Sequence, residues 1–118
     1  MTTANAAPAS VARNGKCEDG EFCLYHLYDL GGSLSDFNTS IANYGSTQPG
    51  CYEFKGPGAG QYQCVKNNAL SAWNNSDHTV RLYYNSNFGG TYVTFPPGSA
   101  LDGGLSQLDY NNASHKFF

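Results

Sequence analysis

The sequence predicts an all-β domain that contains one structural unit twice. The same pattern of an aromatic residue, an apolar residue and a glycine occurs twice, 58 residues apart: Tyr25, Leu30 and Gly32, then Tyr83, Phe88 and Gly90. Glycine is frequent, with 14 of 118 residues, and aromatic residues make up 14%, which favours turns and strands over helices. We therefore expect a duplicated β unit, packed as a sandwich.

The repeated glycine is explained by a tight turn. An aromatic ring can cover a folded hairpin only where the chain reverses beneath it, and Gly32 or Gly90 can adopt a positive φ angle without steric cost. Each copy is therefore expected to form a hairpin that folds back on its own sheet.

Alternating side chains and turn residues predict eight strands. They are expected near residues 21–28, 33–37, 51–54, 61–65, 70–73, 79–84, 91–95 and 113–117. Short helical turns are expected near 39–43 and 104–108. Ser71 and Ser114 lie only 43 residues apart whereas the hairpins lie 58 apart, so the first copy holds about 15 extra residues, between Asn38 and Lys66.

Charge and hydropathy exclude some partners. The net charge is −3 and only 13% of residues are charged, so there is no electrostatic case for a nucleic acid or an anionic membrane surface as partner. The sequence also lacks the long apolar run that a membrane span requires.

The four cysteines predict two disulfides and a location outside a reducing cytosol. Three pairings are possible, and we favour the local one, Cys17 with Cys23 and Cys51 with Cys64, because each pair brackets a short glycine-containing loop. Their spacing does not match a zinc knuckle or ribbon.

Residues 1–15 are expected to form a flexible tail, and residues 16–118 the folded domain. The tail is rich in alanine, threonine and serine and has no apolar periodicity. Its segment Ala4-Asn5-Ala6 has the form of a signal-peptidase site, although no apolar stretch precedes it. The tail is therefore either the remnant of a signal peptide, which implies secretion, or an arbitrary low-complexity terminus.

The duplicated motif resembles the Greek-key signature of the βγ-crystallins. Their pattern is aromatic-x4-aromatic-x-Gly. The second copy, which begins at Tyr83, matches it fully, whereas the first copy has Leu30 in place of the second aromatic residue. Their second signature, Asn/Asp-Asn/Asp-x-x-Ser/Thr-Ser, is matched in part by residues 67–72 and less well by residues 110–115. The resemblance implies a βγ-crystallin-like sandwich of two Greek-key motifs.

Within that superfamily the chain resembles the actinobacterial peptidase-inhibitor family with a crystallin-like fold. The similarity extends from Cys17 to Phe118 and includes the segments FCLY, SAWNNS and VRLYYNSNFGG. It implies a secreted inhibitor of an extracellular peptidase, with a metalloproteinase as the favoured target. A killer-toxin-like or cell-surface-binding module and a calcium-stabilised structural protein are the alternatives.

The extra residues of the first copy are the expected contact surface. Cys51 and Cys64 would staple this loop. Four apolar residues would supply anchors for a partner or complete the core: Tyr52, Phe54, Tyr62 and Val65. By resemblance, the bond presented to the peptidase is Cys64-Val65, with Cys51-Tyr52 as the second choice.

The resemblance also implies two crossed calcium sites. Asn68 and Ser71 would contribute from one copy, and Asn111 and Ser114 from the other. All four side chains are neutral, so the affinity would be low, and the alternative is a purely structural role in the turns. No cofactor is otherwise required.

We expect no enzymatic activity. The three histidines are scattered, no H-E-x-x-H or G-x-S-x-G motif occurs, and disulfide-bonded cysteines cannot act as nucleophiles. A monomer whose partner is a peptidase is the expected state.

Overall fold

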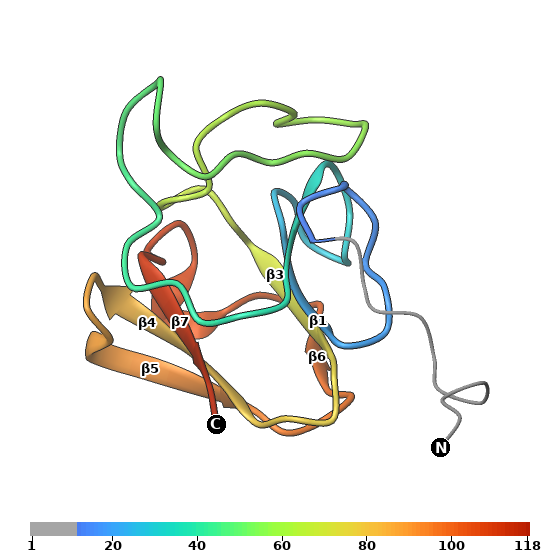
Figure 1. Ribbon diagram of the computed structural model, residues 1–118, viewed down its shortest axis with the longest axis vertical. Helices are drawn as coiled ribbons and strands as arrows, with labels where there is room; N and C mark the ends of the chain where they lie inside the picture. The colour runs from blue at the N-terminus through green and yellow to red at the C-terminus, as the bar shows by residue number, and fades with distance from the viewer. Residues whose placement is uncertain (1–11) are drawn as a thin grey trace, which may run out of the picture.

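Two antiparallel sheets form the body of the molecule, and the computed structural model describes residues 12–118 (Figure 1). The first sheet has the order β2-β1-β3-β6, and the second has the order β5-β4-β7. The strands are β1 (Glu21–Tyr25), β2 (Leu34–Phe37), β3 (Ser71–Asn75), β4 (Val80–Asn85), β5 (Gly89–Phe95), β6 (Ala100–Leu101) and β7 (Ser114–Phe117). One 3-10 turn, η1 (Ser106–Leu108), precedes β7.

The two halves of the chain exchange strands. The strand β6 belongs to the second half but pairs with β3 of the first sheet, where Ala72 faces Leu101. In return, Ile41 of the first half forms an antiparallel bridge with His115 on β7 of the second sheet. This reciprocal exchange confirms the predicted sandwich of two Greek-key motifs.

The repeated glycines adopt the expected conformation. Gly32 has a φ of 71° and Gly90 a φ of 78°. A Cβ atom at Gly90 would lie 2.6 Å from the side-chain nitrogen of Asn85, and one at Gly32 would lie 2.9 Å from Cγ of Leu27. A larger residue at either position would be strained by the positive φ angle and would force the neighbouring side chain to move.

The core lies between the sheets. Phe22 and Leu24 of β1 meet Leu82 and Phe95 of the second sheet, and the rings of Phe22 and Phe95 pack edge to face at 5.3 Å. The opposite face of β1 is buried as well, because the chain that precedes it folds over that face. Every residue of β1 is therefore buried.

Several predicted elements differ from the structure. Residues 51–54 and 61–65 are not regular strands and contribute only the bridge between Glu53 and Cys64. Residues 39–43 form no helical turn, whereas η1 falls within the turn predicted at 104–108. The short strand β6 was not predicted. Within the described part of the chain, no helix is long and apolar enough to cross a bilayer.

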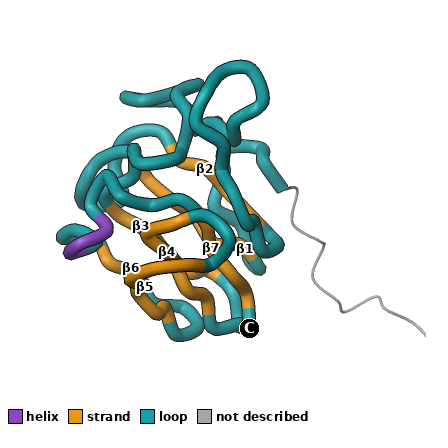
Figure 2. The backbone as a smooth tube through the Cα atoms, turned by 90° about the vertical axis from the view of Figure 1, so that its left-hand side faces the viewer, coloured by secondary structure: helices purple, strands orange, loops and turns teal. Residues whose placement is uncertain are grey.

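The extra residues of the first copy project from one end of the sandwich (Figures 1 and 2). In both views the chain between β2 and β3 forms long loops at the end opposite the C-terminus. Residues 1–11 lie outside the described residues, and with them most of the predicted tail. Arg13, Asn14 and Gly15 do contact the first sheet through hydrogen bonds to Ser35 and Asp36.

A buried histidine joins the base of these loops to the second sheet. The Nε2 atom of His115 lies 2.8 Å from the carbonyl oxygen of Thr39, which can only accept, so Nε2 carries the proton. Its Nδ1 atom then accepts a hydrogen bond of 2.7 Å from the hydroxyl of Tyr44. Burial lowers the pKa of His115 to about 3, so the imidazole is neutral.

Replacement of Tyr44 by phenylalanine should destabilise the protein. The variant leaves Nδ1 of His115 buried without a donor, which costs about 1–3 kcal/mol of unfolding free energy. Urea unfolding at pH 7 measures the loss, with Tyr84→Phe at an exposed position as control. Equal stability of the two variants would show that the hydrogen bond contributes nothing.

Candidate inhibitory surface

Both predicted disulfides are present. Cys17 is bonded to Cys23, and Cys51 to Cys64 with 5.6 Å between their Cα atoms. The second bridge closes the segment 51–64, which we call the stapled segment. Its two ends are also hydrogen-bonded, because the amide of Val65 donates to the carbonyl of Tyr52 at 2.8 Å.

The bond Cys64-Val65 lies on the inside of the stapled segment. Val65 has no exposed surface and belongs to the core cluster, and Cys64 forms the bridge with Glu53. The side chain of Val65 cannot enter a pocket of a peptidase without leaving the core. The structure therefore does not favour this bond as the one presented, because the alternation of the chain points Val65 inward.

The other predicted anchors are also turned toward the core. Phe54 is fully buried and packs edge to face against His26. Tyr52 is half-buried and lies beside the ring of Phe37 at 5.7 Å. Cys51 is half-buried too. These residues hold the stapled segment to the sandwich rather than offer it to a partner.

A continuous exposed stretch lies just before the stapled segment. Residues 46–50 are all exposed and form what we call the 46–50 loop. The amide of Tyr52 donates to the carbonyl of Tyr44 at 2.7 Å, which closes the loop at its base. A Cβ atom at Gly45 would lie 2.9 Å from Cα of Cys51, so the two ends of the loop are in direct contact.

Gln48 fixes the 46–50 loop to the stapled segment. Its side-chain nitrogen donates to the carboxylate of Glu53 at 2.6 Å and to the carbonyl of Tyr62 at 2.7 Å. Tyr62 is 61% exposed, the largest exposed fraction among the big apolar side chains of the described residues. Tyr62 was expected among the apolar anchors of this loop, whereas Gln48 was not expected as a contact residue. The glycines at 56, 58 and 60, which precede Tyr62, are typical of a projecting turn.

The two signature serines play identical roles. The hydroxyl of Ser71 donates to the carbonyl of Leu27 and accepts from the amide of Leu30. In the second copy, the hydroxyl of Ser114 donates to the carbonyl of Asn85 and accepts from the amide of Phe88. Asn85 and Phe88 lie 58 residues after Leu27 and Leu30. Each serine therefore ties its strand to the hairpin of its own copy.

The four residues expected to bind calcium have structural partners. Both serine hydroxyls are used twice, the side-chain nitrogen of Asn68 donates to the carbonyl of Cys64, and that of Asn111 donates to the carbonyl of Asp109. Among the described residues, no three His, Cys, Asp or Glu side chains gather into a metal site. A neutral donor set in which both serine hydroxyls are already engaged is a poor fit for calcium, and binding stays a prediction of the resemblance.

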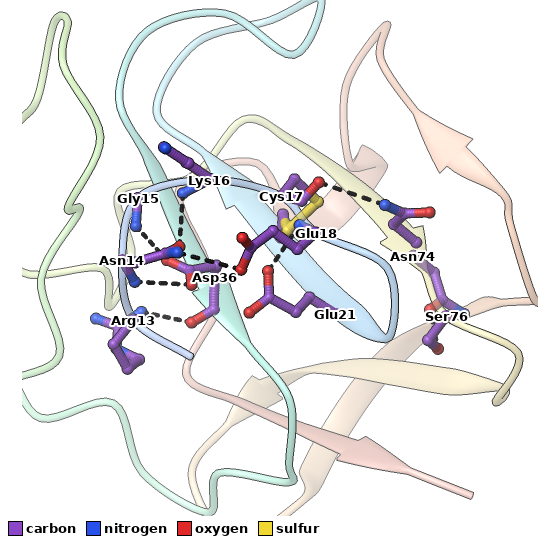
Figure 3. The surroundings of a disulfide bond; sticks show 12 residues. Arg13, Asn14, Gly15, Lys16, Cys17, Glu18, Glu21, Asp36, Asn74 and Ser76 are labelled. Atoms are coloured by element: carbon purple, nitrogen blue, oxygen red, sulfur yellow. Dashed lines mark hydrogen bonds between the residues drawn. A yellow bond between two sulfur atoms is a disulfide. The ribbon is translucent and has the colours of Figure 1, made fainter. Parts of the chain in front are cut away.

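The segment before β1 closes over two buried carboxyl groups (Figure 3). The carboxylate of Asp36 accepts the amides of Asn14 and Gly15, and Oε1 of Glu21 accepts the amide of Glu18. Glu21 is fully buried and its Oε2 has no hydrogen-bond partner. Burial, together with the charge of Asp36, raises the pKa of Glu21 to about 7.

Residues 10–95 match the model of peptidase inhibitor family I36. The chain belongs to this family. Membership identifies a peptidase inhibitor whose partner is a peptidase, and the disulfides agree with an oxidising, extracellular location. A search of curated proteins found no match.

Solved structures similar to this I36 chain include βγ-crystallins. A structure from work on the evolution of the eye lens βγ-crystallin domain fold has a TM-score of 0.65 and 12% identity, and covers 96% of this chain and 93% of its own. A βγ-crystallin from Ciona intestinalis has a TM-score of 0.60, 17% identity and coverages of 84% and 100%. A βγ-crystallin from an archaeon has a TM-score of 0.58 and 17% identity, and the match covers 86% of this chain and 100% of the archaeal one. At these identities the similarity establishes the fold.

Removal of a signature hydroxyl should destabilise the I36 domain with or without calcium. Ser71→Ala leaves the amide of Leu30 and the carbonyl of Leu27 without their partner, so we expect a loss of about 1–3 kcal/mol in unfolding free energy. Thermal and urea unfolding in EDTA and in millimolar calcium measure it, with exposed Ser46→Ala as control. A loss that occurs only with calcium would instead favour a metal site.

Glu21 should make the domain less stable as the pH rises. Its folded pKa of about 7 lies above the ordinary value of 4.5, so the folded state holds the proton more tightly than the unfolded state. Unfolding free energy is therefore lost between pH 4.5 and 7, on the order of 3 kcal/mol. Glu18 and Asp36 face this carboxyl group with negative charge, and Arg13 lies near Asp36.

Glu21→Gln tests this dependence. The neutral amide does not titrate, so the variant should gain stability relative to the natural protein as the pH rises from 4.5 to 7. Urea unfolding at several pH values measures the difference, and Asp102→Asn at an exposed position serves as control. Parallel curves for Glu21→Gln and the natural protein would contradict the assignment.

Proposed function

We propose that the protein is a secreted, monomeric inhibitor of an extracellular metalloproteinase, and that the 46–50 loop and the stapled segment form its contact surface. The family match carries the proposal of inhibition. The choice of surface is supported by exposed chain that is fixed at both ends, since an inhibitor that is ordered before binding loses little conformational entropy when it binds.

Three contacts fix this surface in one conformation. The disulfide of Cys51 with Cys64 closes the stapled segment, the hydrogen bond between Tyr52 and Tyr44 closes the 46–50 loop, and Gln48 joins the two. A peptidase cleft binds extended or projecting chain, and the body of the sandwich remains outside it. The 46–50 loop has no aromatic or charged side chain, which suits entry into a narrow cleft.

Tyr62 is the residue of this surface that fits a metalloproteinase. Thermolysin-like enzymes read an apolar side chain just after the scissile bond, and Tyr62 is the exposed aromatic side chain of the stapled segment. The bond Gln61-Tyr62 therefore replaces Cys64-Val65 as the one that we propose is presented. The disulfide behind it would keep the two sides of that bond together even if it were cleaved.

Inhibition of a thermolysin-like enzyme should depend on Tyr62. In titrations against thermolysin-like, subtilisin-like and papain-like peptidases, we expect inhibition of the first class and a loss of at least tenfold in affinity for Tyr62→Ala. Removal of an exposed aromatic anchor accounts for a loss of this size. Gln48→Ala should weaken inhibition by a smaller factor, because it releases the loop without removing the anchor.

Tyr92→Ala is the matched control, because Tyr92 is 48% exposed on β5 of the second sheet and away from the loops. It should inhibit like the natural protein, and thermal unfolding should show that all three variants are folded. Inhibition of another peptidase class would overturn the choice of target. Full inhibition by folded Tyr62→Ala would exclude the proposed surface.

A further inference from the structure

The outer face of the second sheet carries two neighbouring cations. Arg81 on β4 faces Lys116 on β7 across the strand pair, and faces Thr94 on β5 on its other side. Like charges directly opposite each other on adjacent strands repel. None of the three strands contains an aspartate or a glutamate.

These two cations have no carboxylate partner in the described part of the chain. The ion pairs there are Lys55 with Glu53 and His78 with Asp77, and neither includes the two cations. Arg81 donates through Nε to the hydroxyl of Thr94, and its two terminal nitrogens have no hydrogen bond to any residue that the structure describes. An unneutralised pair of this kind in a chain of net charge −3 is a local positive site.

Exposed aromatic rings surround the two cations. The guanidinium of Arg81 lies 4.5 Å from the ring centre of Tyr92 and 4.9 Å from that of Phe118. The ammonium of Lys116 lies 5.4 Å from the ring centres of Phe118 and Phe88. Tyr92 and Phe118 are about half exposed, with 48% and 51% of their surfaces accessible. The rings hold the charged groups in place and still leave apolar surface open to a ligand.

We propose that this cation–aromatic face, made of Arg81, Tyr92, Lys116 and Phe118, binds an anionic polysaccharide. Its carboxylate or sulfate groups would neutralise the two cations, and arginine binds such planar or tetrahedral anions with two parallel hydrogen bonds. The sugar rings between the charged groups present apolar faces that stack on the exposed aromatic rings. An acidic peptide would match the charges but offers no regular series of ring faces for the flat sheet.

The face lies away from the loops of the proposed inhibitory surface. Tyr92 and Arg81 lie on strands of the second sheet, and Phe118 follows β7 at the C-terminal end, opposite the long loops in Figure 1. Binding of a polysaccharide and binding of a peptidase can therefore occur on one molecule. The proposal does not depend on the peptidase target.

Binding to dextran sulfate and to alginate, with neutral dextran of equal length as reference, tests the proposal. Titration calorimetry and NMR chemical-shift mapping should show binding of the two anionic polymers, no binding of neutral dextran and shifts at Arg81, Tyr92 and Lys116. Affinity should fall as salt increases, because the charges are exposed. The double variant Arg81→Gln/Lys116→Gln should lose at least tenfold in affinity.

Two further variants distinguish binding at this face from a general effect of the protein's positive charge. Lys16→Gln/Lys55→Gln removes the same charge elsewhere and should bind like the natural protein. Tyr92→Ala keeps both cations and should bind several-fold more weakly, while it still inhibits peptidases. Equal loss in both double variants, or equal binding of poly-glutamate and alginate, would overturn the proposal of a polysaccharide site.

Discussion

One buried imidazole holds the loops of the first copy to the sandwich. His115 pairs through its backbone with Ile41 and binds Thr39 and Tyr44 through its two ring nitrogens. Its ring also packs against Phe37 at 4.7 Å. Because Tyr44 forms the base of the 46–50 loop, the position of that loop depends on a hydrogen bond made inside the core.

The fold could be predicted from the sequence because its turn chemistry is local. The glycines of the two hairpins and the signature serines lie at fixed spacings, and the structure shows each serine bonded to its own hairpin. The disulfide pairing followed from the same logic of short loops. The strand exchange was implied only by the resemblance, because β6 has two residues and too short a pattern to detect.

The candidate site was harder to predict because it depends on which side chains of an irregular segment turn toward the core. Neighbouring residues there differ in burial, because Val65 is fully buried and Cys64, next to it, is only partly buried. Net charge was equally uninformative about binding surfaces. Net charge sums all residues and does not tell which of them lie together on the surface. Arg81 and Lys116 become neighbours only when β4 pairs with β7.

The contact between Gly45 and Cys51 closes the 46–50 loop at its base, and only Gln48 of the loop donates a side-chain hydrogen bond to the stapled segment among the described residues. Since its two ends already meet, the length and sequence of the chain between them do not alter the positions of the strands. Such a loop can accept substitutions and insertions while the core stays unchanged. A common scaffold of this type can thus acquire new specificities through changes confined to a few exposed positions.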